Sequence, residues 1–147
     1  MDSIILQLQM LGHILLAMGL GAAIGFEREW ADKPAGLRTH MLVGGSAALL
    51  VSLTDAVIMS VDMDASLIRS DPVRIIEAII TGISFLGAGT ILRRRNGGDV
   101  EGLTTAASLL FVAGIGVAVA ASQYVLAVGA TLLGLGVLYV MKSFAVD

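Results

Sequence analysis

The sequence predicts an all-α, polytopic membrane helix bundle, and three observations carry that prediction. The chain of 147 residues is 56% hydrophobic and 14% charged, with a mean hydropathy of +0.90. Five apolar stretches are each long enough to cross a hydrocarbon layer about 30 Å thick. Of the nine basic and twelve acidic residues, only Asp55 and Glu77 lie inside those stretches, which cover residues 4–26, 41–61, 75–92, 103–120 and 124–141. This pattern excludes soluble, disordered and nucleic-acid-binding proteins, and the absence of cysteine excludes a disulfide-stapled one.

The five predicted transmembrane helices follow one another through short polar connections. They cover residues 4–26, 41–61, 73–92, 103–120 and 123–142. No cationic stretch precedes the first helix, so we expect it to remain in the mature protein instead of being cleaved as a signal peptide. Asp71 and Pro72 are typical of a helix start and open the third helix. The connections are too short to form domains, so residues 1–147 form a single transmembrane domain.

The positions of lysine and arginine predict the orientation of the bundle. One side carries Arg28, Lys33, Arg38, Arg93, Arg94, Arg95 and Lys142, and the other carries only Arg69 and Arg74. Because cytoplasmic loops are enriched in lysine and arginine, the amino terminus is predicted outside and the carboxyl terminus in the cytoplasm. Trp30 and Tyr124 are then placed at the two membrane interfaces, where aromatic side chains are common.

The 18 glycines indicate close contact between helix backbones. Small or polar residues recur every three or four positions: His13, Ala17, Gly21 and Gly25; Gly45, Ala48, Ser52 and Asp55; Arg74, Glu77, Thr81, Ser84 and Ala88. We expect these three stripes to face one another inside the bundle, because charged side chains are costly against lipid. Packing alone is the favoured explanation over a permeation path. Such faces outnumber the partners available in one bundle, which predicts a homo-oligomer.

A possible cation or proton site lies toward the outer side of the predicted bundle. Its candidate residues are His13, Asp55, Asp71 and Glu77, with Arg74 at a similar depth. Carboxylates and an imidazole can hold a hard cation or relay protons. The favoured alternative is a buried ion pair of Arg74 with Asp55 or Glu77, with His13 donating to a backbone carbonyl, because arginine repels a cation. Magnesium binding is possible at this stage, and no resident cofactor is expected.

A second polar cluster is predicted on the cytoplasmic side. It contains Glu27, Arg28, Glu29, Gly36, Leu37, Arg38, Thr39 and His40, with Thr104 and Thr105 at the start of the fourth helix. Gly36 allows a turn that brings Arg38 back onto Glu27 or Glu29, a bidentate pair that would lock the first two helices together. The alternative is a binding surface for a partner or an anion.

Three glycines, Gly82, Gly87 and Gly89, occupy one predicted helix. A break there would expose carbonyls to an ion, as in discontinuous transport helices, whereas an unbroken helix would admit a neighbouring backbone. Packing is the favoured explanation. The chain contains no motif for a nucleophile with its base, a metalloprotease or a phosphate-binding loop, so no enzymatic activity is expected.

Four strings resemble the membrane domain of the MgtC/SapB family. They are GAAIGFEREW, AGLRTHMLVGGSAALL, DPVRIIEAIITGISFLGAG and GLTTAASLLFVAGIGV, in the family's order and spacing, from about Leu15 to Tyr124. The resemblance implies a multi-pass protein of the bacterial inner membrane, associated with magnesium limitation and with survival in host phagocytes. It also implies action on other membrane proteins, including the F-type ATP synthase, more than magnesium transport.

The resemblance carries over to individual positions. The family's motif residues are Glu27, Arg28, Gly36, Leu37, Arg38, Thr39, Arg74, Gly82, Phe85, Leu86, Gly87, Ala88, Gly89, Gly102, Leu103, Thr105 and Ala106. The virulence-linked member has an asparagine where this chain has Thr104 and a cysteine where it has Phe111, and it has a glutamine near Glu77. That asparagine is tied to partner regulation in that member. We expect the cytoplasmic domain that many members append after the last helix to be missing after Asp147.

Overall fold

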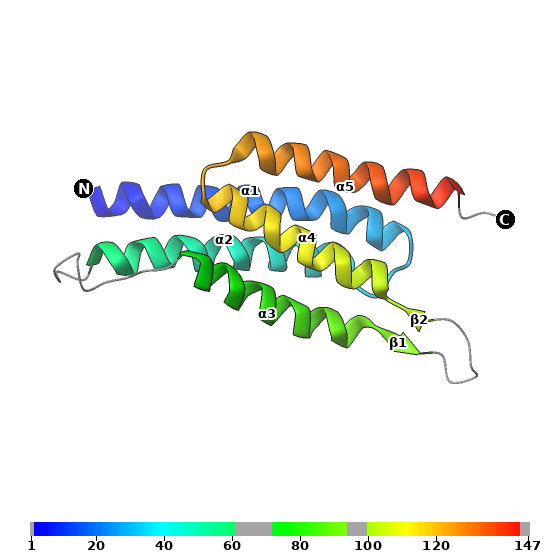
Figure 1. The fold of residues 1–147 in the computed structure, drawn as a ribbon. Coiled ribbons are helices and arrows are strands. Elements are labelled where there is room, and N and C mark those ends of the chain that lie inside the picture. Colours follow the sequence, from blue (N-terminus) through cyan, green and yellow to red (C-terminus); the bar gives the residue numbers. More distant parts are fainter. Residues whose placement is uncertain (1, 61–71, 94–99, 145–147) are drawn as a thin grey trace.

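A computed structural model of the chain describes residues 2–60, 72–93 and 100–144. In these residues the order of elements is α1 (Asp2–Trp30), α2 (Leu37–Ser60), α3 (Pro72–Thr90), β1 (Leu92–Arg93), β2 (Val100–Glu101), α4 (Leu103–Ala120) and α5 (Tyr124–Phe144). The helices run side by side along one axis (Figure 1). The described residues therefore form the predicted all-α bundle, with one short pair of antiparallel strands added to it.

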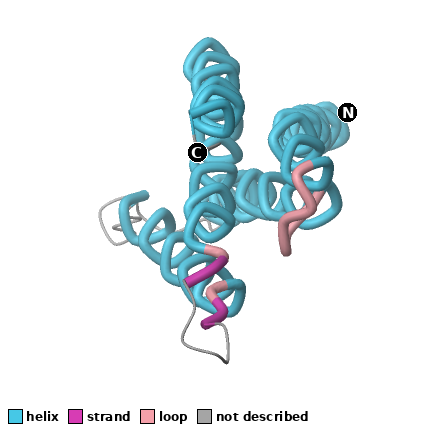
Figure 2. Tube along the Cα trace, turned by 90° about the vertical axis from the view of Figure 1, so that its right-hand side faces the viewer, coloured by secondary structure: helices cyan, strands magenta, loops and turns pink. Residues whose placement is uncertain are grey.

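The centre of the bundle is formed by α1, α2 and α4. Each of these helices packs on the other two, whereas α5 packs on α4 and α1. Helix α3 packs mainly on α4 and touches α2 at a few positions. Seen from the end of the bundle, α3 therefore lies at its edge (Figure 2).

Glycines let the three central helices approach one another closely. A Cβ atom at Gly21 would lie 2.6 Å from the carbonyl oxygen of His40, and one at Gly44 would lie 2.8 Å from that of Ala17. A Cβ atom at Gly116 would collide with the carbonyl oxygen of Gly44. Backbone lies directly against backbone at these points, as expected where dispersion drives helix association.

The helix ends differ from the limits of the apolar stretches. Helix α1 continues past Phe26 to Trp30, and α2 begins at Leu37 instead of residue 41. These extra turns are polar, and a helix does not stop where its apolar face stops. Helix α3 ends at Thr90, earlier than the predicted residue 92, because Leu92–Arg93 pairs with Val100–Glu101.

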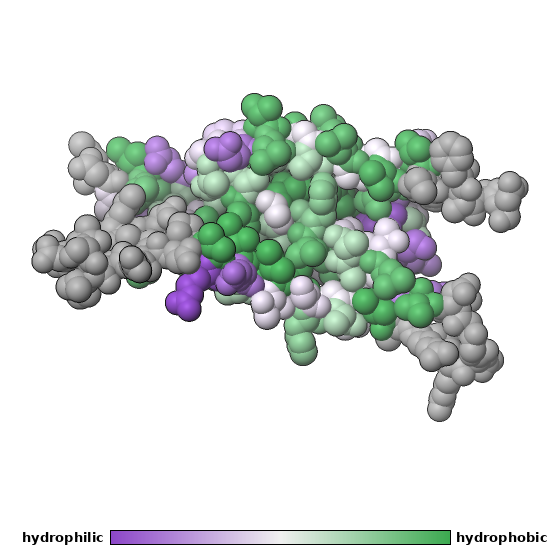
Figure 3. All heavy atoms as spheres, viewed as in Figure 1, coloured by the Kyte–Doolittle hydropathy of each residue, from purple (hydrophilic) through white to green (hydrophobic). Residues whose placement is uncertain are grey.

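The outer surface of the bundle is rich in apolar side chains. Leu15, Val125 and Leu133 are 68%, 91% and 72% exposed. Figure 3 shows apolar side chains over the middle of one face and polar ones toward its two ends. Among the described residues, three helical segments are long and apolar enough to cross a membrane, Ser3–Trp30, Val73–Thr90 and Leu103–Ala120, and Tyr124–Val140 is a shorter apolar helix. This surface suits a lipid environment.

Helix α3 runs unbroken through Gly82, Gly87 and Gly89, so the disfavoured alternative of a broken helix with exposed carbonyls does not hold. One expectation about α3 is wrong. The stripe from Arg74 to Ala88 is exposed and does not face the other two stripes. The reason is that Ile79 and Gly87, on the opposite side of α3, pack toward the bundle, with Gly87 against Ala106.

Candidate functional site

Polar side chains meet at one end of the bundle, which we call the Trp30 end. It consists of the last turn of α1, residues 31–36, the start of α2 and the start of α4. Amide groups of Ala31, Asp32 and Lys33 donate to carbonyls of Glu27, Glu29 and Arg28, which closes the end of α1. The chain then turns directly into α2, so residues from α1 and α2 are held close together.

The buried Arg28 and the half-buried Glu27 form an ion pair at this end. Nε of Arg28 donates to Oε2 of Glu27 at 2.6 Å, and Nη2 donates to Oε1 at 2.9 Å. Arg28 is only 5% exposed. Two parallel hydrogen bonds are the geometry that a guanidinium and a carboxylate favour.

The link between α1 and α2 is made by Glu29. Its Oε2 atom accepts a hydrogen bond of 2.8 Å from the backbone N–H of Leu37 and so satisfies an amide in the first turn of α2. A Cβ atom at Gly36 would lie 2.7 Å from the same Oε2 atom, so glycine leaves room for this contact. Arg38 is exposed and makes no ion pair in the part of the chain that the structure describes. The predicted ion pair of Arg38 with Glu27 or Glu29 is therefore wrong. Glu27 is paired with Arg28 instead, and Glu29 accepts a hydrogen bond from the backbone N–H of Leu37.

A buried histidine joins α2 to α4 just behind these residues. Nδ1 of His40 lies 2.8 Å from the carbonyl oxygen of Gly36, and Nε2 lies 2.9 Å from Oγ of Ser108. Oγ of Ser108 lies 2.8 Å from the carbonyl oxygen of Thr105. His40 is fully buried, so both ring nitrogens are satisfied without water. His40 belongs to the cytoplasmic cluster that the sequence predicts, whereas Ser108 is a partner that the sequence pattern did not indicate.

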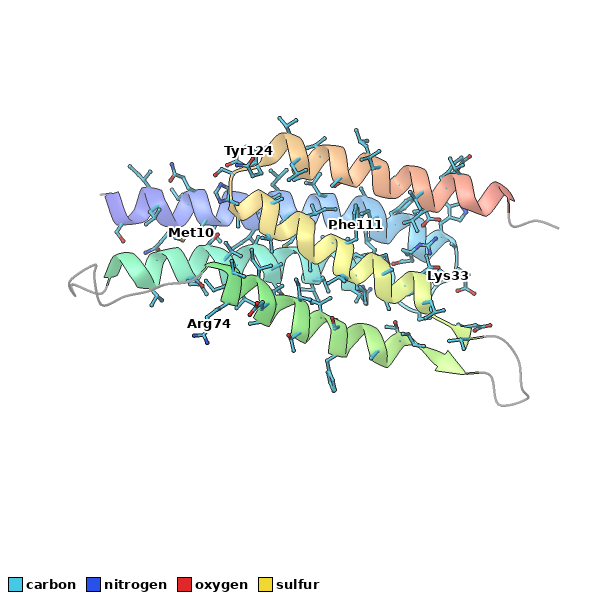
Figure 4. The ribbon with its side chains drawn as sticks, viewed as in Figure 1. Met10, Lys33, Arg74, Phe111 and Tyr124 are labelled. Atoms are coloured by element: carbon cyan, nitrogen blue, oxygen red, sulfur yellow. The ribbon has the colours of Figure 1, made fainter. Side chains whose placement is uncertain are left out.

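The same end of the bundle contains a polar pocket of about 740 Å³. It is lined by Arg28, Asp32, Lys33, Pro34 and residues 100–105. Lys33 lies in the connection from α1 to α2 (Figure 4). Helix α4 starts here at Gly102 without a side-chain cap; Thr104 is exposed and Thr105 is buried. The pocket therefore brings Arg28, Thr104 and Thr105 together, whereas the neighbouring Thr39 is half-buried on α2.

The candidate residues near the other end are more dispersed. Nε2 of His13 lies 2.7 Å from the hydroxyl oxygen of Tyr124, so that hydroxyl, and no backbone carbonyl, is its partner. Arg74 and Glu77 are exposed on α3, and Arg74 points away from the other helices (Figure 4). Asp71 and the side chain of Asp55 lie outside the described residues. Across the residues that are described, no three histidine, cysteine or acidic side chains come close enough to hold a metal.

The motif residues of α3 occupy two sides of that helix. Gly87 faces α4, whereas Gly82 and Gly89 have no atom within 4 Å of a built Cβ position. Phe85 is 86% exposed. These residues are therefore not part of the cluster at the Trp30 end.

The fold and the site define a helical membrane protein with a closely packed core, in which Arg28 and His40 are buried at the Trp30 end, whereas Ser52 and Thr131 are buried elsewhere in the bundle. A family model described as the MgtC family matches residues 14–146, and the chain belongs to that family.

Curated relatives support the assignment. The chain is 43% identical over 121 residues to "Protein MgtC" of Salmonella typhimurium strain LT2, a match that covers 82% of this chain and 47% of the relative. It is 39% identical over 133 residues to "Putative magnesium transporter YhiD" of Escherichia coli K12, covering 88% of this chain and 59% of the relative. An "Uncharacterized protein" of Haemophilus influenzae is 40% identical over 120 residues, covering 82% and 50%. The chain thus spans about half the length of these relatives, and no solved structure matches it.

Proposed function

We propose that this chain is a regulatory or accessory protein of the bacterial inner membrane that acts by binding other membrane proteins. Its role is linked to adaptation to magnesium limitation and, through that adaptation, to virulence. The family membership and the name of the Salmonella relative support this setting. The single observation that favours regulation over transport is the closed core of α1, α2 and α4.

Close packing of the three central helices within one copy of the described bundle supports regulation over ion passage. The backbones of the three helices touch at Gly21, Gly44 and Gly116. A conducted cation needs a chain of polar groups across the apolar layer. The buried polar side chains Arg28 and His40 instead lie at the Trp30 end, where hydrogen bonds already satisfy them.

The charge distribution supports an orientation for this proposed protein. With the amino terminus outside, the Trp30 end faces the cytoplasm, and so does the polar pocket beside Lys33 and Thr104. A cytoplasmic pocket beside exposed Arg38 suits contact with the cytoplasmic loops of a partner. The protein performs no catalysis and needs no cofactor in this proposal.

The alternative function is cation transport, and one observation favours it. Helix α3 presents Arg74, Glu77 and Thr81 on an exposed face, and a path between several copies would need such a lining. The Escherichia coli relative carries the word transporter in its name. Regulation remains the stronger proposal, because the exposed face of α3 also contains Arg74, which repels cations.

A flux measurement separates the two functions. Purified protein is reconstituted in liposomes that contain a magnesium-sensitive dye, and empty liposomes with a magnesium ionophore serve as the positive control. We expect no magnesium entry above that of empty liposomes. Entry that Glu77→Ala abolishes and Glu101→Ala leaves unchanged would establish transport and overturn the regulatory proposal.

A growth experiment tests the regulatory role directly. A strain that lacks the chromosomal gene is complemented with the wild-type chain and grown in medium of limiting magnesium. We expect growth to recover without an increase in the initial rate of magnesium uptake, because the protein acts on other membrane proteins. Cross-linking in intact cells followed by mass spectrometry should identify such a protein. Recovery accompanied by faster uptake would contradict the proposal.

A further inference from the structure

One side of α3 is polar and has no partner among the described residues. We call it the outer face of α3 and define it by Arg74, Glu77, Thr81, Gly82, Ser84 and Gly89, which are all exposed. At about 100° per residue these positions fall on one side of the helix, and the buried Ile79 and Gly87 fall on the other. Phe85, which is 86% exposed, falls on the same side, so the outer face of α3 combines two charged side chains and several small residues with one large apolar side chain.

The two charged side chains on this face are unusual for a helix that faces lipid. Val73–Thr90 is long and apolar enough to span a membrane. The hydroxyl of Thr81 is satisfied by the carbonyl oxygen of Glu77 at 2.8 Å. Arg74 and Glu77, however, form no ion pair in the part of the chain that the structure describes. Exposed charges on a spanning helix normally turn toward protein or water.

Helix α5 shows what a lipid-facing side looks like in the same molecule. It also lies at the periphery and also packs on α4. Its exposed side consists of Val125, Leu132, Leu133 and Val137, which are 91%, 64%, 72% and 62% exposed. The polarity of α3 is therefore a local property and not a general feature of the outer helices.

We propose that a second copy of this chain covers the outer face of α3. All copies insert in the same orientation, so a two-fold axis along the membrane normal brings the two α3 helices together in parallel. Each copy presents one positive and one negative side chain a helical turn apart, about 4.5 Å along the axis. Arg74 of each copy can then reach Glu77 of the other. The same helix–helix contact therefore forms two equivalent ion pairs, and all four charges are neutralised.

Two glycines of the outer face, one before and one after Phe85 in the sequence, leave room for a second helix. A Cβ atom built at Gly82 or Gly89 would meet nothing within 4 Å, so both positions are open to an incoming backbone. Ser84 and Thr81 supply hydroxyls that can bond across a helix pair. The inference rests on the membrane setting of the proposed function, and it assigns the face through which the chain binds itself.

A charge-reversal pair tests the contact between copies. Arg74→Glu makes the outer face wholly acidic, and Glu77→Arg makes it wholly basic. We expect each variant alone to lose self-association at least tenfold, measured by energy transfer between labelled copies in liposomes. Mixed together, the two variants should associate to within about threefold of wild type, because opposite charges meet only between different copies.

This design separates contacts between copies from contacts within one copy. In the mixed pair each chain still has two like charges on its own α3. If the loss of association came from repulsion inside a single copy, mixing the variants would not reverse it. Mixed variants that associate no better than each alone would overturn the proposal.

Cysteine cross-linking provides a second measurement with an almost unchanged chain. The sequence contains no cysteine, so single substitutions report without background. Oxidised membranes that contain Thr81→Cys or Ser84→Cys should yield a disulfide-linked dimer, and Leu133→Cys on α5 is the matched control. Equal dimer yields from α3 and α5, or no dimer from either α3 variant, would contradict the proposal. These results are independent of the flux measurement, so the self-association and the regulatory role can fail separately.

Discussion

Glycines of the core and glycines of α3 have different surroundings in this molecule. Gly21, Gly44 and Gly116 lie against backbone atoms of a neighbouring helix, so any side chain there would collide. Gly82 and Gly89 lie on an exposed face with no neighbour within 4 Å of a Cβ position. The comparison shows that a small residue in a membrane helix does not by itself identify a close contact, because the position of the neighbouring helix must also be known. Substitutions in the core of α1, α2 and α4 should therefore affect stability far more than substitutions on the exposed face of α3.

The largest effect is expected from Gly116→Ala. The added methyl group would collide with the carbonyl oxygen of Gly44, and a backbone atom cannot move away as a flexible side chain can. Overpacking typically costs about 1–3 kcal/mol, and we expect about 3 kcal/mol here. Unfolding in detergent, followed by circular dichroism, measures the loss. Gly136→Ala on α5 is the control, because nothing lies within 4 Å of its Cβ position. Equal stability of the two variants would mean that the core is loosely packed.

His40→Leu tests the buried hydrogen bonds between α2 and α4. The substitution removes the contacts to the carbonyl of Gly36 and to Ser108 inside a closed site. Leaving buried polar groups without a partner costs about 1–3 kcal/mol, so we expect a loss of about 2 kcal/mol. The same unfolding measurement applies, with Thr81→Val on the exposed side of α3 as the control. A loss of stability in Thr81→Val but not in His40→Leu would contradict this prediction.

Arg28→Lys tests the bidentate pair with Glu27. Lysine keeps the charge but cannot make two parallel hydrogen bonds, and Arg28 is 5% exposed, so little water can compensate. We expect a loss of about 1–2 kcal/mol, below the full cost of breaking a buried pair. Arg38→Lys should change the midpoint of unfolding hardly at all, because Arg38 is exposed. If Arg38→Lys were the more damaging of the two, the assignment of the pair would be incorrect.

Gly89→Ala is expected to have the smallest effect, and of opposite sign. Alanine is favoured over glycine inside a helix by about 1 kcal/mol, and no atom opposes the new methyl group within one copy. Monomeric protein in detergent should therefore gain about 0.5–1 kcal/mol in its free energy of unfolding. A clear loss under those conditions would show that Gly89 already packs against its own bundle.

Much of the fold was predictable because the apolar stretches are long and nearly free of charge. The start and end of α4, residues 103–120, agree with the predicted limits, since polar or turn-forming residues stand at both ends. The end of α1 was less predictable, because Glu27, Arg28 and Glu29 are polar and yet helical. Hydropathy reports where lipid ends, whereas helical hydrogen bonds continue to Trp30.

The candidate site was predictable only in part. Glu27, Arg28 and Gly36 do gather at one end of the bundle, and Arg28 and Thr105 line one pocket. The sequence could not show which arginine pairs with Glu27, because Arg28 and Arg38 are both within reach of a turn at Gly36. The direction of the stripe on α3 was equally ambiguous. Its periodicity shows that Glu77 and Thr81 share a side, but it does not show which side α4 covers.

Gly102 governs how α3 is presented to its surroundings. Its backbone is left-handed, with φ at +93°, and a Cβ atom there would collide with the carbonyl oxygen of Thr90 at the end of α3. Any other amino acid would be strained there and would also push the two helix ends apart. The end of α3 can therefore lie directly against the start of α4 only because the residue at this position has no side chain.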